Sequence, residues 1–167
     1  MQTFDNILNV IDSKLRGILA IMCSLLVVDV TWQVLTRFIL TQPSSFTEEV
    51  ARFLLIWISL IGGAYAYRLH SHLGFDLIVK NISIQKSIFI YRLCSLLVAI
   101  FAILVLIVGG LNLVDMTWTL GQHSAVLNIP MAFIYLVLPI SGVLFLIYSV
   151  YFFLTAQDVK SSKETSV

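Results

Sequence analysis

The chain has 167 residues, of which 59% are hydrophobic and only 11% are charged, and its net charge at pH 7 is +1. So few charges cannot cover a water-soluble domain, in which about a quarter of the residues are charged, so the composition predicts an integral membrane protein. The near-zero net charge also argues against nucleic acid as a partner.

The first sixteen residues carry apolar side chains at helical spacing: Phe4, Ile7, Leu8, Ile11 and Leu15. Polar residues occupy the other faces of this segment. The pattern predicts a short amphipathic helix over residues 1–16, lying along the cytoplasmic face of the membrane. The alternative is a frayed terminal tail.

The first apolar run extends from Gly17 to Leu40, which is long enough to cross a hydrocarbon core of about 30 Å. Its only charges are Asp29, near its middle, and Arg37. Gln33 lies between them at a four-residue step, so the three side chains share one helix face, which we expect to meet protein or water. Asp29 either couples transport to a proton or cation, or is a structural polar residue buried against a neighbouring helix.

The second span, over residues 46–67, begins with three charges, Glu48, Glu49 and Arg52. Ser45 and Glu48 form a capping box, in which each side chain bonds a free backbone N–H of the first turn. Acids near a helix start also suit the helix dipole. Capping explains one acid only, so we predict that the three charges contact a partner protein.

Small residues in the same span form two pairs at four-residue spacing, Ser59 with Gly63 and Gly62 with Ala66. In membranes such pairs let two helices approach closely. We therefore predict that these four residues, together with Arg37 and the three charges above, bind a partner.

Two further spans follow, over about residues 88–115 and 130–155, and the fourth contains no charge. Pro139, followed by Gly142, predicts a kink near the middle of the fourth span. The spans make residues 17–155 one four-helix, all-α membrane domain, and the polar residues 156–167 are predicted to form a disordered tail.

Lysine and arginine outside the spans show a strong bias between the connections. They occur before the first span, between the second and third, and after the fourth, whereas the connections 43–47 and 116–129 contain neither. By the positive-inside rule we expect both termini in the cytoplasm.

The inventory lacks a catalytic or cofactor-binding constellation. The spans hold no histidine for a haem, and Cys23 and Cys94 lie singly in apolar runs. His70, His72 and Asp76 lack the spaced ligands of a metal site, so we interpret His72 and Asp76 as structural polar residues. We predict no enzymatic activity, no cofactor and no metal.

Three stretches resemble a known family: RFILTQPSSFTEEVARFLLIW, GGAYAYRLHSHLGFDLI and LNIPMAFIYLVLPISG. From about Arg37 to Gly142 the chain is similar to the DctQ-like small membrane subunits of tripartite ATP-independent periplasmic (TRAP) transporters. The positions that carry the resemblance are Arg37, Phe38, Glu48, Glu49, Ala51, Arg52, His72, Asp76, Pro130, Pro139 and Gly142. Phe46 and Thr47 depart from the family, where Trp-Ser is frequent.

The resemblance implies a non-catalytic subunit in the bacterial inner membrane, surrounded by lipid, that binds a large multi-span permease holding the substrate and sodium sites. A soluble periplasmic binding protein would deliver an organic acid, with sialic acid favoured over a C4-dicarboxylate. The main alternative is a stand-alone, homo-oligomeric four-span transporter that uses Asp29 as its coupling acid. A second alternative is an assembly factor or lipid-binding anchor.

Overall fold

The computed structural model describes residues 2–39, 45–70 and 84–155, and this part of the chain is helical apart from one connection. Within these described ranges, four helical segments are long and apolar enough to cross a membrane, over residues 8–39, 45–69, 88–119 and 131–155. This confirms the predicted all-α fold with four spans. The elements are α1 (Gln2–Ile39), α2 (Ser45–His70), α4 (Ile84–Phe101), η1 (Ala102–Gly109), α5 (Gly110–Thr119), α6 (Met131–Tyr135) and α7 (Val137–Thr155).

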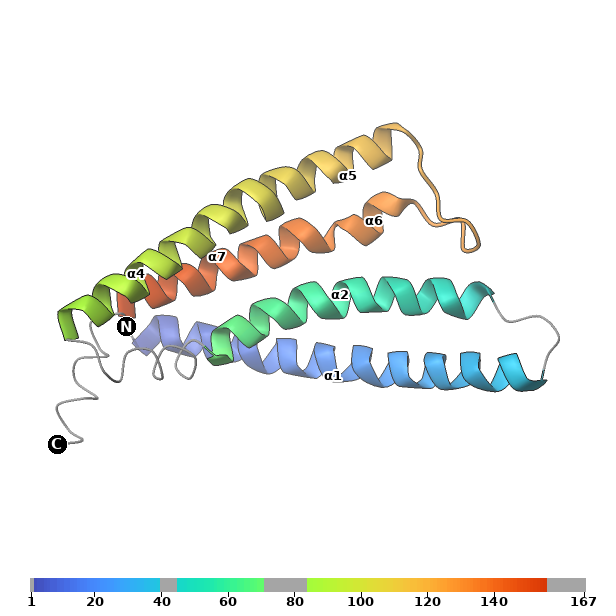
Figure 1. Ribbon diagram of the computed structural model, residues 1–167, viewed down its shortest axis with the longest axis horizontal. Coiled ribbons are helices and arrows are strands. Elements are labelled where there is room, and N and C mark those ends of the chain that lie inside the picture. Colours follow the sequence, from blue (N-terminus) through green and yellow to red (C-terminus); the bar gives the residue numbers. More distant parts are fainter. Residues whose placement is uncertain (1, 40–44, 71–83, 156–167) are drawn as a thin grey trace.

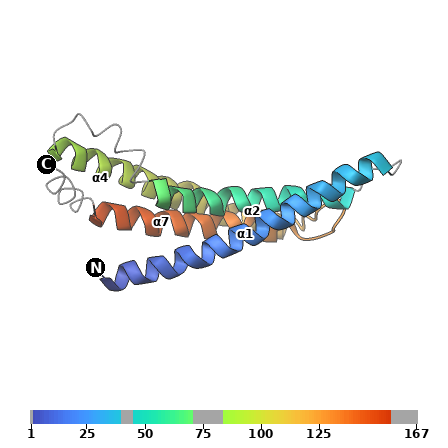
Figure 2. The same ribbon diagram turned by 90° about the horizontal axis from the view of Figure 1, so that it is seen from below.

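The four spans form a layer in the order α1, α2, α7 and then α4–η1–α5, in which the start of α1 crosses over so that it contacts both α2 and α7 (Figures 1 and 2). The start of α1 and the end of α7 lie at the same end of this layer (Figure 1). Beyond this crossing, α2 and α7 have neighbours on their two sides only, so the layer presents two broad faces. Both faces carry many exposed apolar side chains.

α1 is one unbroken helix of 38 residues. Within the segment 1–16, predicted to form a short helix of its own, residues 2–16 are continuous with the first span. Leu8 and Leu15 from this segment are 0% and 9% exposed and belong to the same buried cluster as Ile61 of α2 and Tyr148 of α7. This segment therefore packs onto the layer.

The third span changes its winding near the middle, where α4 gives way to the eight-residue π-helix η1 and then to α5. Glycines, which have no side chain, allow this span to lie close to the fourth. A Cβ placed on Gly142 would lie 2.8 Å from the Leu106 Cβ and 3.2 Å from the Ile107 backbone nitrogen. A Cβ on Gly110 would lie 2.9 Å from the Leu138 Cβ. The tightest glycine contacts in the described residues are thus between these two spans.

The fourth span is interrupted at Leu136, between α6 and α7. Pro139 explains the break, because proline has no N–H to donate to the carbonyl four residues earlier, at Tyr135. The interruption lies near the start of the span, whereas the sequence predicts it near the middle. Pro130 stands before α6 with an extended backbone, at φ −58° and ψ 124°.

Candidate partner interface

Glu49 joins the start of α2 to the loop between α5 and α6. Its carboxylate oxygens accept hydrogen bonds from three successive backbone N–H groups, those of Ala125 (3.1 Å), Val126 (3.1 Å) and Leu127 (2.7 Å). The residue is only 8% exposed. Of the three charges expected to contact a partner, Glu49 is thus bound by its own chain.

The loop is folded so that its amide groups converge on this acid. α5 ends in a Schellman motif, with Gly121 at φ +60° and hydrogen bonds of 3.0 Å from its N–H to the Trp118 carbonyl and from the Gln122 N–H to the Thr117 carbonyl. The Met131 N–H returns to the Gln122 carbonyl at 2.9 Å. Successive amides of such a loop form an anion-binding concavity, which the Glu49 carboxylate fills.

Glu48 and Arg52 face outward and pair with each other. The Arg52 Nη2 donates to the Glu48 Oε1 at 3.1 Å, and the Arg52 and Glu48 side chains are 66% and 63% exposed. Ser59 and Ala66 are also exposed, and at about 100° per residue they lie on the same side of α2. We call these four residues the α2 stripe. It brings together half of the charges and half of the small residues expected to bind a partner.

The two glycines of the second span, Gly62 and Gly63, are half-buried rather than fully exposed. A Cβ on Gly62 would lie 3.7 Å from a Leu19 methyl group, and one on Gly63 would lie 3.8 Å from the Phe145 ring. Both distances are ordinary van der Waals contacts, so α1 and α7 approach α2 without needing glycine there.

Asp29 lies in a groove between α1 and α2, with a cavity of about 420 Å³. Its Oδ2 atom is buried and has no hydrogen-bond partner in the described part of the chain. Gln33, one turn further along α1, is half-buried, and Arg37 at the end of α1 is exposed. The groove is lined by Leu25, Val28, Asp29, Trp32, Val50 and Leu54.

These neighbours place Asp29 beside the first part of α2. Val50 and Leu54 belong to the second and third turns of α2, which begins at Ser45. Asp29 is also 10 residues from the end of the 8–39 span and 21 from its beginning. Along the 8–39 helix, Asp29 therefore lies nearer the end that adjoins the start of α2 than the opposite end.

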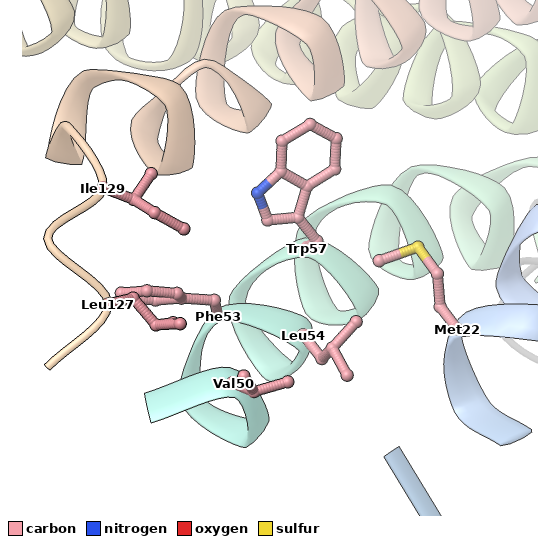
Figure 3. A pocket seen from close by; sticks show the side chains of 7 residues that line it. All are labelled: Met22, Val50, Phe53, Leu54, Trp57, Leu127 and Ile129. Carbon is pink, nitrogen blue, oxygen red and sulfur yellow. The ribbon is translucent and has the colours of Figure 1, made fainter. Parts of the chain in front are cut away.

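A second apolar cavity of about 350 Å³ adjoins the groove, because Val50 and Leu54 border both. Figure 3 shows Leu127 and Ile129 of the loop on one side and Met22 of α1 on the other, with the α2 side chains between them. We call the side of the layer that carries both cavities the groove face. The second cavity is lined by Met22, Val50, Phe53, Leu54, Trp57, Leu127 and Ile129.

A polar cluster that sequence reasoning missed joins α1, α2 and α7 at the other end of the layer. The Arg68 Nε donates to the Asp12 Oδ2 at 3.2 Å, and the Tyr148 hydroxyl donates to the Asp12 Oδ1 at 2.7 Å. The Arg68 guanidinium also stacks on the Tyr151 ring, at 4.3 Å from its centroid. Asp12 and Arg68 are 56 residues apart, so no local pattern signals their pairing.

The remaining predicted residues have structural positions or lie outside the described residues. Ser45 is the exposed first residue of α2. Pro139 and Gly142 are buried where the fourth span meets the third. His72 and Asp76 fall within residues 71–83, outside the described part.

Residues 16–158 match the family described as "Tripartite ATP-independent periplasmic transporters, DctQ component". The chain belongs to this family. Membership confirms the resemblance noted in the sequence, and with the four spans it makes this DctQ chain a multi-pass protein of the bacterial inner membrane and a transporter component.

Two curated relatives give the DctQ assignment more detail. Over 88 residues the chain is 35% identical to the "Sialic acid TRAP transporter small permease protein SiaQ" of Vibrio cholerae, which covers 52% of this chain and 50% of that one. Over 121 residues it is 32% identical to the "Isethionate TRAP transporter permease protein DctMQ" of Oleidesulfovibrio alaskensis, covering 67% of this chain and 18% of that one. The chain thus spans half or less of the length of these relatives.

Proposed function

We propose that this DctQ chain is the small permease subunit of a TRAP transporter and braces a larger, multi-span permease subunit during sodium-coupled uptake of an organic acid. The small subunit itself carries no substrate. A periplasmic binding protein delivers the substrate to the complex, and both termini of the small subunit lie in the cytoplasm.

The observation that carries this proposal is the single layer of helices with its exposed apolar faces. None of the most apolar part of α1 is buried within the chain, and Val27 and Val28 remain 65% and 67% exposed. Such surfaces suit lateral contact with another membrane protein and with lipid. A transport path instead needs polar groups facing a shared cavity. The polar clusters of Glu49 and Asp12 join helices at the two ends of the layer.

The relatives support the partner and the substrate class. One is named a small permease protein for sialic acid. The other, DctMQ, is a permease protein of which the matched part is only 18%, which suggests that a DctQ-like segment works beside a much longer permease segment. We therefore infer a separate large permease partner here, and favour sialic acid over a C4-dicarboxylate.

The test is reconstitution into sodium-free vesicles of the chain alone, and of the chain with its organism's large TRAP permease subunit, with sodium either added outside or left out. With the binding protein and radiolabelled sialic acid outside, we expect sodium-driven uptake only when both membrane subunits are present. Uptake by vesicles that contain this chain alone would overturn the proposal. If Asp29→Asn abolished that uptake, the stand-alone transporter with Asp29 as coupling acid would replace it.

A further inference from the structure

The groove face carries a buried polar atom that lacks a partner within the described residues. On the groove face, the Asp29 Oδ2 is buried without a hydrogen-bond partner in the described residues. On the opposite side of α2, the charged residues Glu48 and Arg52 satisfy each other and are exposed. With about 100° per residue, the α2 stripe points roughly 120–180° away from Val50 and Leu54, which line the groove.

An unpaired carboxyl group at this depth is costly beside lipid tails, because hydrocarbon offers no hydrogen bond to it. Asp29 lies beside the second and third turns of α2, inside the rim formed by the helix start. The self-paired Glu48 and Arg52 have no such requirement. The groove face therefore needs a polar partner, whereas the α2 stripe does not.

The shape of the groove fits a side chain from another helix. Its cavity of about 420 Å³ is apolar except for Asp29, and it continues into the second cavity of about 350 Å³. The groove is lined mainly by large apolar side chains, and Trp32, which is 58% exposed, forms part of its wall. An apolar helix bearing one hydrogen-bond donor would complement both the shape and the carboxylate.

We propose that the groove face, and not the α2 stripe, is the surface that docks the large permease, through an apolar transmembrane helix whose donor side chain bonds the Asp29 carboxylate. This inference rests on the proposed function, which supplies the partner. It assigns the other broad face, with the α2 stripe, to lipid and the membrane surface.

Site-specific photo-crosslinking tests which face is used. A benzoylphenylalanine is placed at Trp32 in the groove or at Ser59 on the α2 stripe, and the chain is co-expressed with the large permease subunit. We expect the permease adduct to form several-fold more strongly from position 32. A stronger adduct from position 59, or an adduct from position 32 with a second copy of this chain, would overturn the inference.

The role of the acid is tested by Asp29→Leu, with Val27→Leu on the far side of α1 as its matched control. Leucine removes an unpaired polar group, so the isolated subunit should unfold at the same or a higher temperature. Association with the permease should weaken by roughly 3- to 20-fold, the range of interhelical hydrogen bonds measured in membranes. Asp29→Asn, which keeps an acceptor oxygen, should weaken association less.

A destabilised isolated Asp29→Leu subunit with unchanged association would mean that the acid serves the fold only. An equal loss of association with Val27→Leu would remove the role of the carboxylate. If the wild-type subunit and permease do not associate at all, the proposed function fails as well. Association without a groove contact overturns this inference alone.

Discussion

Gly142→Ala is predicted to destabilise the protein, although alanine usually favours a helix. The new Cβ would lie 2.8 Å from the Leu106 Cβ and from the Ile107 Cγ1, and 3.2 Å from the Ile107 backbone nitrogen. Carbon atoms in contact prefer about 3.5–4.0 Å, so the two spans must separate by about half an ångström or more. The Leu106 Cβ and the Ile107 backbone nitrogen are fixed by the helix backbone, so a rotamer change cannot remove this clash.

The size of the effect follows from two opposing contributions. Overpacking costs about 1–3 kcal/mol, and contacts of 2.8 Å to a Cβ and of 3.2 Å to a backbone nitrogen place this case in the upper half of that range. Replacing glycine by alanine inside a helix contributes about 1 kcal/mol of stability. The expected net loss for Gly142→Ala is therefore about 1–2 kcal/mol, or about 2–8 °C in the unfolding midpoint for a chain of this size.

The control is the same substitution at Gly63, where the nearest atom to the new Cβ is 3.8 Å away. With no clash to oppose the helix preference, Gly63→Ala should leave the midpoint unchanged or raise it. Both variants are compared with wild type by tryptophan fluorescence during heating in the same detergent. Equal midpoints for the two variants would refute the reasoning, because only the crowding at Gly142 separates them.

Three further predictions concern the polar contacts and the loop. Glu49→Gln should speed proteolysis between α5 and α6, because the glutamine amide has one acceptor oxygen in place of the two that accept three N–H bonds. The exposed Glu48→Gln should leave the cleavage rate unchanged. Tyr148→Phe and Asp12→Asn should each lower stability by about 1–2 kcal/mol, and their double mutant should lose less than the sum; strict additivity in thermal unfolding would argue against a shared hydrogen bond. Gly121→Ala should cost about 1 kcal/mol in the same assay, since φ of +60° is unfavourable for any residue with a Cβ; an unchanged midpoint would contradict this.

Much of the fold could be predicted from the sequence, because membrane spans are signalled by local composition. The number of spans and their approximate limits depend on runs of apolar residues that hydrocarbon requires. The continuity of α1 was not visible, since the amphipathic pattern of residues 1–16 is the same for a helix on the membrane surface and for one packed on α2. Only the burial of Leu8 and Leu15 separates the two cases.

The candidate site was harder to predict because its contacts join distant parts of the chain. From the sequence, Glu49 is interpreted as a helix-capping or partner-binding acid. The backbone N–H groups that bond its carboxylate lie 76–78 residues later in the chain. Gly110 lies beside Gly109 in an apolar run whose sequence does not indicate which helix it packs against. Its close approach to Leu138 could therefore not be predicted. Asp29 was recognised as unusual from its charge alone, but its neighbours on α2 were not.

The two polar contacts of α2 have a mechanical consequence. Glu49 holds one end of this helix to the loop, and Arg68 holds the other end to α1, about 28 Å away along the axis at 1.5 Å per residue. Sliding α2 by one turn, about 5.4 Å, would break both contacts at once. Apolar surfaces alone would permit such slippage with little resistance. Because α2 is held near both ends, the helix layer resists sliding of α2 along its neighbours.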